Sequence, residues 1–258
     1  KRRGLLKLVD DVNFYAEHFE VHLVEAVSLL FELMGQAEEV DTKLKCLNVL
    51  TIVMTAMQGR IQPVVQGILQ AVPALWEEAK KEELMMGAVL VTIQRLVQAL
   101  GTSVTAIEPF IVNVIGNAAD VDSENELYTL EDGLDLWLHF ARNLPHASPQ
   151  LLTLFPLLNK TLARDFDHLQ VCMHIIESML LLNRGELVEI HGNAIGQIFM
   201  SVLGYVKDAA TLIALEVLDT LLVVEAERGV VWLESSGVAY KVLSMMLDAD
   251  ENFLVRAS

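Results

Sequence analysis

The chain has 258 residues, of which 53% are apolar, and it carries a formal net charge of −17. This length allows one large domain or two ordinary ones, and so apolar a composition excludes a disordered chain. The acidic charge argues against direct binding of nucleic acid and favours basic partners or simple solubility. One of the two longest runs without a charge, 190–206, contains His, Asn, Gln and three glycines, and therefore predicts a buried helix and no membrane insertion.

The two cysteines, Cys46 and Cys172, both lie inside apolar helical patterns. They predict a reducing compartment and no disulfide. The first residues, Lys-Arg-Arg-Gly, have no initiator Met and no apolar segment behind them, so they do not form a signal peptide. The last residues, 252–258, stop inside a new helical pattern. From both ends we expect an internal piece of a longer protein.

Apolar residues recur with helical spacing along the chain, and no β-period stretch of useful length interrupts them. Residues 1–19 contain a helix remnant, and 248–258 contain the start of a truncated helix. Between them the pattern predicts helices over 20–34, 42–58, 61–79, 82–100, 102–118, 126–143, 148–163, 165–183, 187–206, 208–227 and 230–247. Gly35, Gly59 and Gly101 mark helix ends, while Asp41 and the pair Ser148-Pro149 mark helix starts.

The first helices of successive pairs begin near 20, 61, 104, 148, 187 and 231, a period of about 40 residues that is typical of HEAT hairpins. The predicted hairpins are 20–59, 61–101, 102–143, 148–183, 187–227 and, in part, 230–247, about five and a half in all. Five of the six prolines fall in first helices, and Pro73 would kink one of them. The predicted fold class is therefore all-α, an α-solenoid (superhelix) of HEAT repeats. The alternative is a single irregular helical bundle.

Side chains that could carry chemistry are scattered. His18 and His22 share a helix face with Glu25, but no cysteine or second histidine pair completes a metal site. No Ser or Cys near the other five histidines forms a nucleophile and base pair. We therefore expect no enzyme, no metal and no cofactor. The small-residue pattern Gly192-x-x-x-Gly196 predicts close packing of two helices.

The most uneven feature is the run 120–135, which holds seven acidic residues and no Lys or Arg. The helix that follows has an apolar side, so Glu131, Asp135 and His139 are predicted to project to solvent or to a ligand. The apolar side comprises Leu127, Leu130, Leu134, Trp137, Leu138 and Ala141, with Trp137 expected in the core. One interpretation is a solvated loop followed by acids that suit the helix dipole. The other is a patch that attracts Lys/Arg-rich partners, with candidate partner-binding residues Glu124, Glu126, Glu131, Asp132 and Asp135.

Three blocks of sequence resemble a known family: Pro73-Ala-Leu-Trp76, Leu96-Val-Gln-Ala-Leu-Gly101 and, most specifically, Leu127-Tyr-Thr-Leu-Glu-Asp-Gly-Leu-Asp-Leu-Trp-Leu138. They resemble the middle repeats of the karyopherin-β (importin-β superfamily) nuclear transport receptors, within which the importin-11 group and its fungal relatives are most similar. The resemblance extends more weakly across 20–183, and beyond it the prediction rests on periodicity.

The resemblance implies a HEAT superhelix that carries protein cargo, here basic, through nuclear pores under control of Ran-GTP, moving between cytoplasm and nucleus. It implies that Ran-GTP binds mainly the N-terminal repeats of a longer parent protein, and that phenylalanine–glycine nucleoporins bind apolar slots between outer helices. Second helices line the concave, cargo-facing side, where Glu131, Asp132 and Asp135 would lie. The expected function is the central cargo-binding portion of an importin-type receptor, and the alternative is a HEAT scaffold subunit of a cytosolic enzyme complex.

Overall fold

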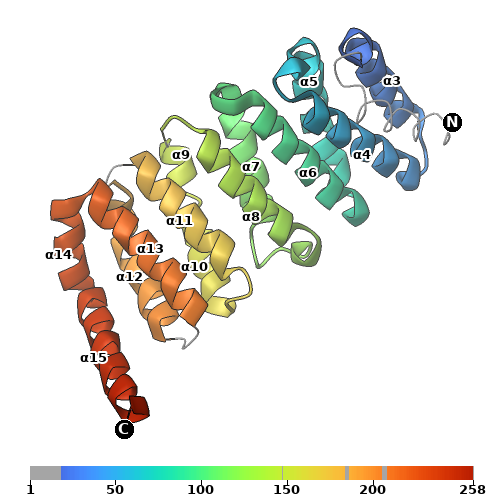
Figure 1. Ribbon diagram of the computed structural model, residues 1–258. Coiled ribbons are helices and arrows are strands. Elements are labelled where there is room, and N and C mark those ends of the chain that lie inside the picture. The colour runs from blue at the N-terminus through green and yellow to red at the C-terminus, as the bar shows by residue number, and fades with distance from the viewer. Residues whose placement is uncertain (1–18, 147, 184–185, 205–207, 258) are drawn as a thin grey trace. The chain divides into compact units, whose positions relative to one another are not determined.

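The computed structural model describes residues 19–146, 148–183, 186–204 and 208–257, which form helices and turns without a β-strand among them (Figure 1). The chain divides into two compact units, 1–144 and 145–258. His18 and the rest of the expected remnant before Phe19 lie outside the described residues.

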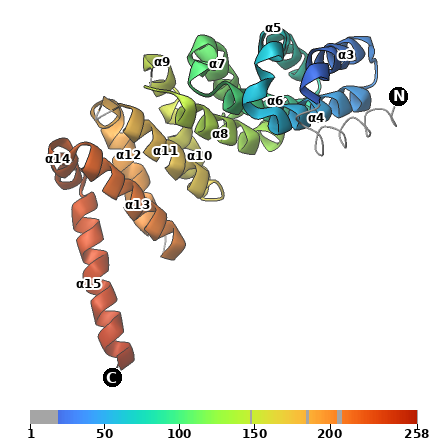
Figure 2. The same ribbon diagram turned by 45° about the horizontal axis from the view of Figure 1, so that its top comes forward.

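The first unit is built from helical hairpins in two layers. The first helices are α3 (Leu23–Gln36), α5 (Gln62–Ala79) and α7 (Glu108–Ala118), and the second helices are α4 (Val40–Met57), α6 (Glu83–Leu100) and α8 (Glu126–Asn143). The second helices lie side by side as one layer, and the first helices form the other (Figure 2). Trp76, Trp137 and Phe140 are fully buried between the layers, where their large apolar areas stabilise the stack.

The second unit repeats this arrangement. It contains α9 (Pro149–Leu152), α10 (Phe155–Arg164), α11 (Leu169–Asn183), α12 (Glu186–Gly204), α13 (Asp208–Val224), α14 (Ala226–Ser236) and α15 (Val238–Ala257). Helix α11 packs beside α13, and α12 packs against α10 and α14. The His191 ring stacks on Phe155 with 4.7 Å between centroids, and its Nε2 lies 3.0 Å from the Leu152 carbonyl oxygen.

The predicted close packing at Gly192 and Gly196 is confirmed. A Cβ at Gly192 would lie 3.1 Å from Cδ1 of Trp232, and one at Gly196 would lie 3.2 Å from Cβ of Ser236. The Trp232 indole N–H donates to the Gly192 carbonyl oxygen at 2.9 Å. The two glycines therefore let α14 approach the backbone of α12 closely enough for this hydrogen bond.

Proline and glycine divide two helices that the periodicity predicts as single. Ser148 is confirmed as a helix start, because its Oγ accepts from the backbone N–H of Leu151 at 3.1 Å. The helix stops at Leu152, and α10 begins afresh with Pro156 in its first turn, where a proline needs no hydrogen-bond partner. The predicted helix 230–247 is likewise wrong: Gly237 adopts φ +77°, ends α14 and precedes α15, which runs on to Ala257.

Other differences occur at helix ends. Asp41 does not cap α4, because it lies in the first turn and pairs with Lys45. The helix α4 ends at Met57, with Gln58 rather than Gly59 at positive φ. Residues 101–107 form a 3₁₀ turn before α7, and Pro73 sits inside α5 without ending it. The predicted first helix opens with a 3₁₀ turn, Glu20–His22, and Val21 and Val24, which recur at helical spacing with the buried Val27, are exposed.

The stretch Glu83–Ala118 is long and apolar enough, by length and composition alone, to cross a membrane, and half of its apolar 18-residue window is buried. Here it is divided by the 3₁₀ turn into α6 and α7, whose apolar side chains pack between hairpins. An apolar helix that is covered on more than one side is the expected core element of a stacked helical protein.

Candidate partner-binding surface on the second helices

Helix α8 is seated between α6 and α7 through two close approaches at glycine. A Cβ at Gly133 would lie 2.9 Å from the backbone carbon of Ala118, the last residue of α7. A Cβ at Gly87 of α6 would lie 3.0 Å from Oδ2 of Asp132. With Leu134 and Trp137 also fully buried, the position of α8 is fixed, and the side chains on its uncovered side are presented in a defined row.

The uncovered side of the second-helix layer carries residues at helical spacing. On α8 the row is Leu127, Glu131, Asp135, His139 and Arg142. On α6 it is Leu84, Ala88, Val91, Arg95 and Gln98. On α4 it includes Lys45, Asn48, Thr51 and Thr55, and hollows along the junction of α4 and α6 are lined by residues from both rows. We call this side the second-helix surface.

Three of the five predicted partner-binding residues, Glu131, Asp132 and Asp135, come together on this surface. Glu131 is exposed, whereas Asp132 and Asp135 are partly covered. Burial beside Gly87 raises the pKa of Asp132, and the neighbouring charges of Glu131 and Asp135 raise it further. Glu124 lies exposed in the loop before α8, and Glu126 begins the helix, more than a turn from Glu131. The surface is therefore acidic toward the N-terminal end of α8.

Exposed apolar side chains stand beside these acids, and the periodicity did not predict them. Leu127, expected on the buried side of α8, is 89% exposed, and Leu84 and Tyr128 are 64% and 47% exposed. Helix α7 ends at Ala118, which meets α8 at Gly133, nearly two turns beyond Leu127. The first turn of α8 therefore extends past its cover. An aromatic and two leucines beside carboxylates form the kind of anchor that protein interfaces use.

His139, predicted to project to solvent or to a ligand, is only partly exposed, because its ring also contacts α6. Its Nδ1 lies 2.9 Å from Nε2 of Gln94 on α6 and 2.8 Å from the carbonyl oxygen of Asp135. Depending on the tautomer, Nδ1 accepts from the amide or donates to the carbonyl. In both cases the imidazole is partly buried and helps to hold α8 beside α6.

The first-helix side carries an apolar groove between α3 and α5. Its volume is about 610 Å³, and its lining includes Phe31, Met34, Ala71, Ala74 and Leu75. Three polar residues, Lys43, Gln70 and Glu78, line it as well, and Lys43 and Glu78 form an ion pair.

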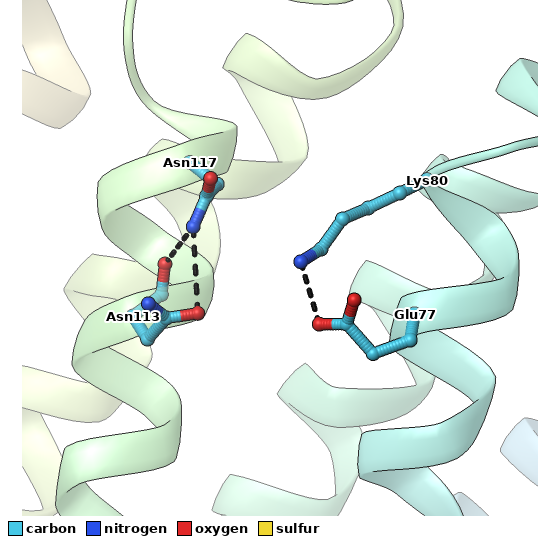
Figure 3. Close-up of polar contacts among 4 residues, drawn as sticks. All are labelled: Glu77, Lys80, Asn113 and Asn117. Atoms are coloured by element: carbon cyan, nitrogen blue, oxygen red, sulfur yellow. Dashed lines mark hydrogen bonds and ion pairs between the residues drawn. The ribbon is translucent and has the colours of Figure 1, made fainter.

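The facing sides of α5 and α7 are polar instead (Figure 3). There Lys80 pairs with Glu77 at 2.5 Å, and the amide of Asn117 donates to the Asn113 carbonyl oxygen at 2.6 Å. On this side of the unit, a partner with apolar side chains would therefore find its site at the α3–α5 groove.

The described residues offer neither a cluster of metal ligands nor an exposed thiol. Within the described part of the chain, no three His, Cys, Asp or Glu side chains gather as a possible metal site. Cys46 and Cys172 are free and buried, and burial, followed by the charge of Asp165, raises the pKa of Cys172 to about 12. A thiol with that pKa is almost wholly protonated at neutral pH and is a poor nucleophile.

Comparison with known proteins gives consistent matches. A family model described as "Importin-11-like, TPR repeats" matches residues 87–258. The chain is similar to Importin-11 of Homo sapiens (33% identity over 225 residues) and of Mus musculus (32% over 225 residues). Each match covers 87% of this chain and 23% of the relative. It is also similar to the importin beta-like protein KAP120 of Saccharomyces cerevisiae, with 27% identity over 68% of this chain and 18% of that protein. The chain thus spans about a quarter of the length of the Importin-11 relatives.

A solved structure gives the same result for the fold. Lph2 of S. cerevisiae, described as a bidirectional nuclear transport receptor, matches with a TM-score of 0.82 and 23% identity over 92% of this chain and 25% of that chain. The predicted all-α solenoid is therefore confirmed, and so is the family resemblance read from the three sequence blocks.

Proposed function

Because the chain belongs to the importin-11-like family, we propose that it is the central cargo-binding portion of a nuclear transport receptor. The longer parent protein carries proteins through the nuclear pore under control of Ran-GTP and moves between cytoplasm and nucleus. The chain acts by binding and by flexing between neighbouring hairpins, since each hairpin of a solenoid contacts only its neighbours.

The observation that supports this role best is the acidic end of the second-helix surface. Glu131, Asp132 and Asp135 are crowded on one turn of α8 and face no cation that would neutralise them within the described residues. A Lys/Arg-rich cargo segment relieves that repulsion, while Leu84, Leu127 and Tyr128 receive its apolar side chains. Charge attracts the cargo and fixes its register, and apolar contact slows its release.

The α3–α5 groove is the proposed nucleoporin slot. A phenylalanine ring fits among Phe31, Met34, Ala71 and Leu75, and the volume of about 610 Å³ leaves room for the flanking glycine backbone. Ala74→Glu places a charge in this groove with little loss of helix propensity, and Gln66→Glu on the exposed side of α5 is its control. Capture on immobilised phenylalanine–glycine peptides should fall for Ala74→Glu alone. A scaffold subunit has no reason to bind these peptides, so their failure to capture the unaltered chain would favour the scaffold alternative.

Binding of the longer parent protein to Ran tests the transport role as a whole. Ran loaded with GTP should bind and displace a crude basic-protein fraction, whereas Ran loaded with GDP should do neither. If both nucleotide forms fail to bind, the transport role is wrong and the scaffold alternative takes its place.

A further inference from the structure

A pocket of about 470 Å³ opens where α4 and α6 end. It is lined by Met54, Thr55, Gln58, Arg95, Gln98 and Leu100, together with Gly59, Ala99 and Gly101. The turns that end the two helices have similar backbones, with φ +46° at Gln58 and φ +53° at Gly101. Among the described residues, Gln58 is the one non-glycine at positive φ. Such a conformation is sterically unfavourable for a residue with a Cβ, and it persists only where the surroundings impose it.

The guanidinium of Arg95 is the unusual group in this pocket. Its Nη1 donates to Oε1 of Gln98 at 2.8 Å, but its Nε is buried without a hydrogen-bond partner. The described residues include no acid in an ion pair with Arg95, although the chain has 35 acidic residues and 18 basic ones. A charged guanidinium that is partly desolvated and short of acceptors is costly, so Arg95 gains from an acceptor that enters the pocket it lines.

We propose that this pocket binds a carboxylate of a partner polypeptide. The guanidinium fork matches a carboxylate with two parallel N–H donors, and Gln58 and Gln98, whose side chains also carry N–H donors, line the same pocket. Met54 and Leu100 provide apolar walls for the stem that carries the carboxylate. The negative dipole ends of α4 and α6 oppose any anion, and they oppose a doubly charged phosphate more strongly than a singly charged carboxylate, so the charge of Arg95 has less to offset with a carboxylate.

The pocket lies on the same surface as the proposed cargo site on α8. Only the idea that one partner contacts both places rests on the proposed function. Gln94, the residue before Arg95, contacts His139 of α8. His139 lies eight residues beyond Glu131 along the same helix. Eight residues of helix span roughly 12 Å. A segment that contacts both places therefore presents basic side chains near Glu131 and a carboxylate about 12 Å away near Arg95.

The test is side-chain NMR of the 258-residue chain with ¹⁵N-labelled arginine. The Arg95 Nε–Hε signal is assigned by its loss in Arg95→Lys, and four probes are titrated: acetyl-Gly-Leu with a free C-terminus, acetyl-Leu-Glu-amide, acetyl-Gly-Leu-amide and sodium chloride. We expect a saturable downfield shift of the Arg95 signal with at least one of the two carboxylate peptides. Saturation by acetyl-Gly-Leu identifies a chain terminus as the group that is bound, and saturation by acetyl-Leu-Glu-amide identifies an acidic side chain. The amide and chloride should cause no saturable shift.

Variants separate the pocket from general charge effects. Carboxylate affinity, measured for the variants by isothermal titration calorimetry because Arg95→Lys lacks the arginine signal, should be about tenfold weaker in Arg95→Lys, since an ammonium loses the bidentate geometry. It should be unchanged in Arg142→Lys, which alters an exposed arginine on α8. The carboxylate–amide comparison uses the unaltered chain and does not depend on how a variant folds. If neither carboxylate shifts the Arg95 signal, or the amide and chloride shift it equally, the proposal is overturned and Arg95 serves only the helix ends. Binding of basic peptides at α8 is measured separately, so either idea can fail alone.

Discussion

The seating of α8 can be tested by adding a single methyl group at Gly133. The new Cβ would lie 2.9 Å from the backbone carbon and the Cβ of Ala118, a separation that real Cβ contacts do not show. The neighbour is helix backbone, so relief requires α7 and α8 to separate. Overpacking of this kind costs about 1–3 kcal/mol.

The same substitution also improves helix propensity, by about 1 kcal/mol in a helix interior. Gly67→Ala on α5 isolates that gain, because nothing lies within 4 Å of its added Cβ. We therefore expect Gly67→Ala to stabilise by about 1 kcal/mol and Gly133→Ala to destabilise by about 1 kcal/mol, a difference of about 2 kcal/mol.

Urea unfolding followed by far-ultraviolet circular dichroism measures this difference. With a slope of about 2 kcal/mol per molar urea, the two midpoints should differ by about 1 M. If Gly133→Ala is stabilised as much as Gly67→Ala, α7 and α8 do not approach as closely as the structure has them, and the defined presentation of the α8 row loses its basis.

Three further outcomes follow from the same structure. Cys172, with its pKa raised to about 12, and buried Cys46 should react with a disulfide reagent at pH 8 only at the rate of unfolding, and prompt reaction of either native thiol would contradict their burial. Asp132→Asn should raise stability at pH 7 by about 0.5 kcal/mol, since it removes a crowded, partly buried charge. Because the folded-state pKa of Asp132 is raised, the protonated carboxyl at low pH does not destabilise the fold, and the destabilisation appears as the carboxyl ionises with rising pH. The gain in stability of Asp132→Asn should therefore vanish near pH 3. A gain that persists at that pH would refute this cause. Ser148→Ala should cost about 1 kcal/mol in a thermal melt, through loss of the N-cap bond to Leu151, whereas Ser148→Asp should retain stability.

Helical periodicity was sufficient to predict the fold class, because each hairpin buries its apolar stripe against neighbours of the same kind. It placed α8 correctly from Glu126 to Asn143 and Trp137 in the core. It failed where two local signals compete. At Pro156 and at Gly237 the apolar spacing of the sequence continues, but the helix ends nearby and a new one begins. The spacing alone does not tell whether the helix continues through the proline or glycine or ends there.

The candidate surface was predictable only in part. Glu131 is exposed as its angular position on the helix predicts, since the opposite side is apolar. Leu127 shares the angle of the buried leucines, and its exposure depends on where α7 ends, which no local pattern encodes. The partner of His139 is Gln94, 45 residues away, and the isolation of Arg95 depends on the end of α4 lying beside it. Such features require the packing of neighbouring hairpins.

The most direct measurement of the central claim is the affinity of a fluorescent Lys/Arg-rich peptide for the chain, by anisotropy, with single charge reversals. Glu131→Lys changes the acidic end of the second-helix surface, and Glu25→Lys makes the same change in charge on the exposed side of α3. We predict that Glu131→Lys weakens binding about fivefold, equivalent to about 1 kcal/mol, and that added salt reduces the difference. If Glu131→Lys and Glu25→Lys bind the peptide equally well, the acidic end of α8 is not the cargo site.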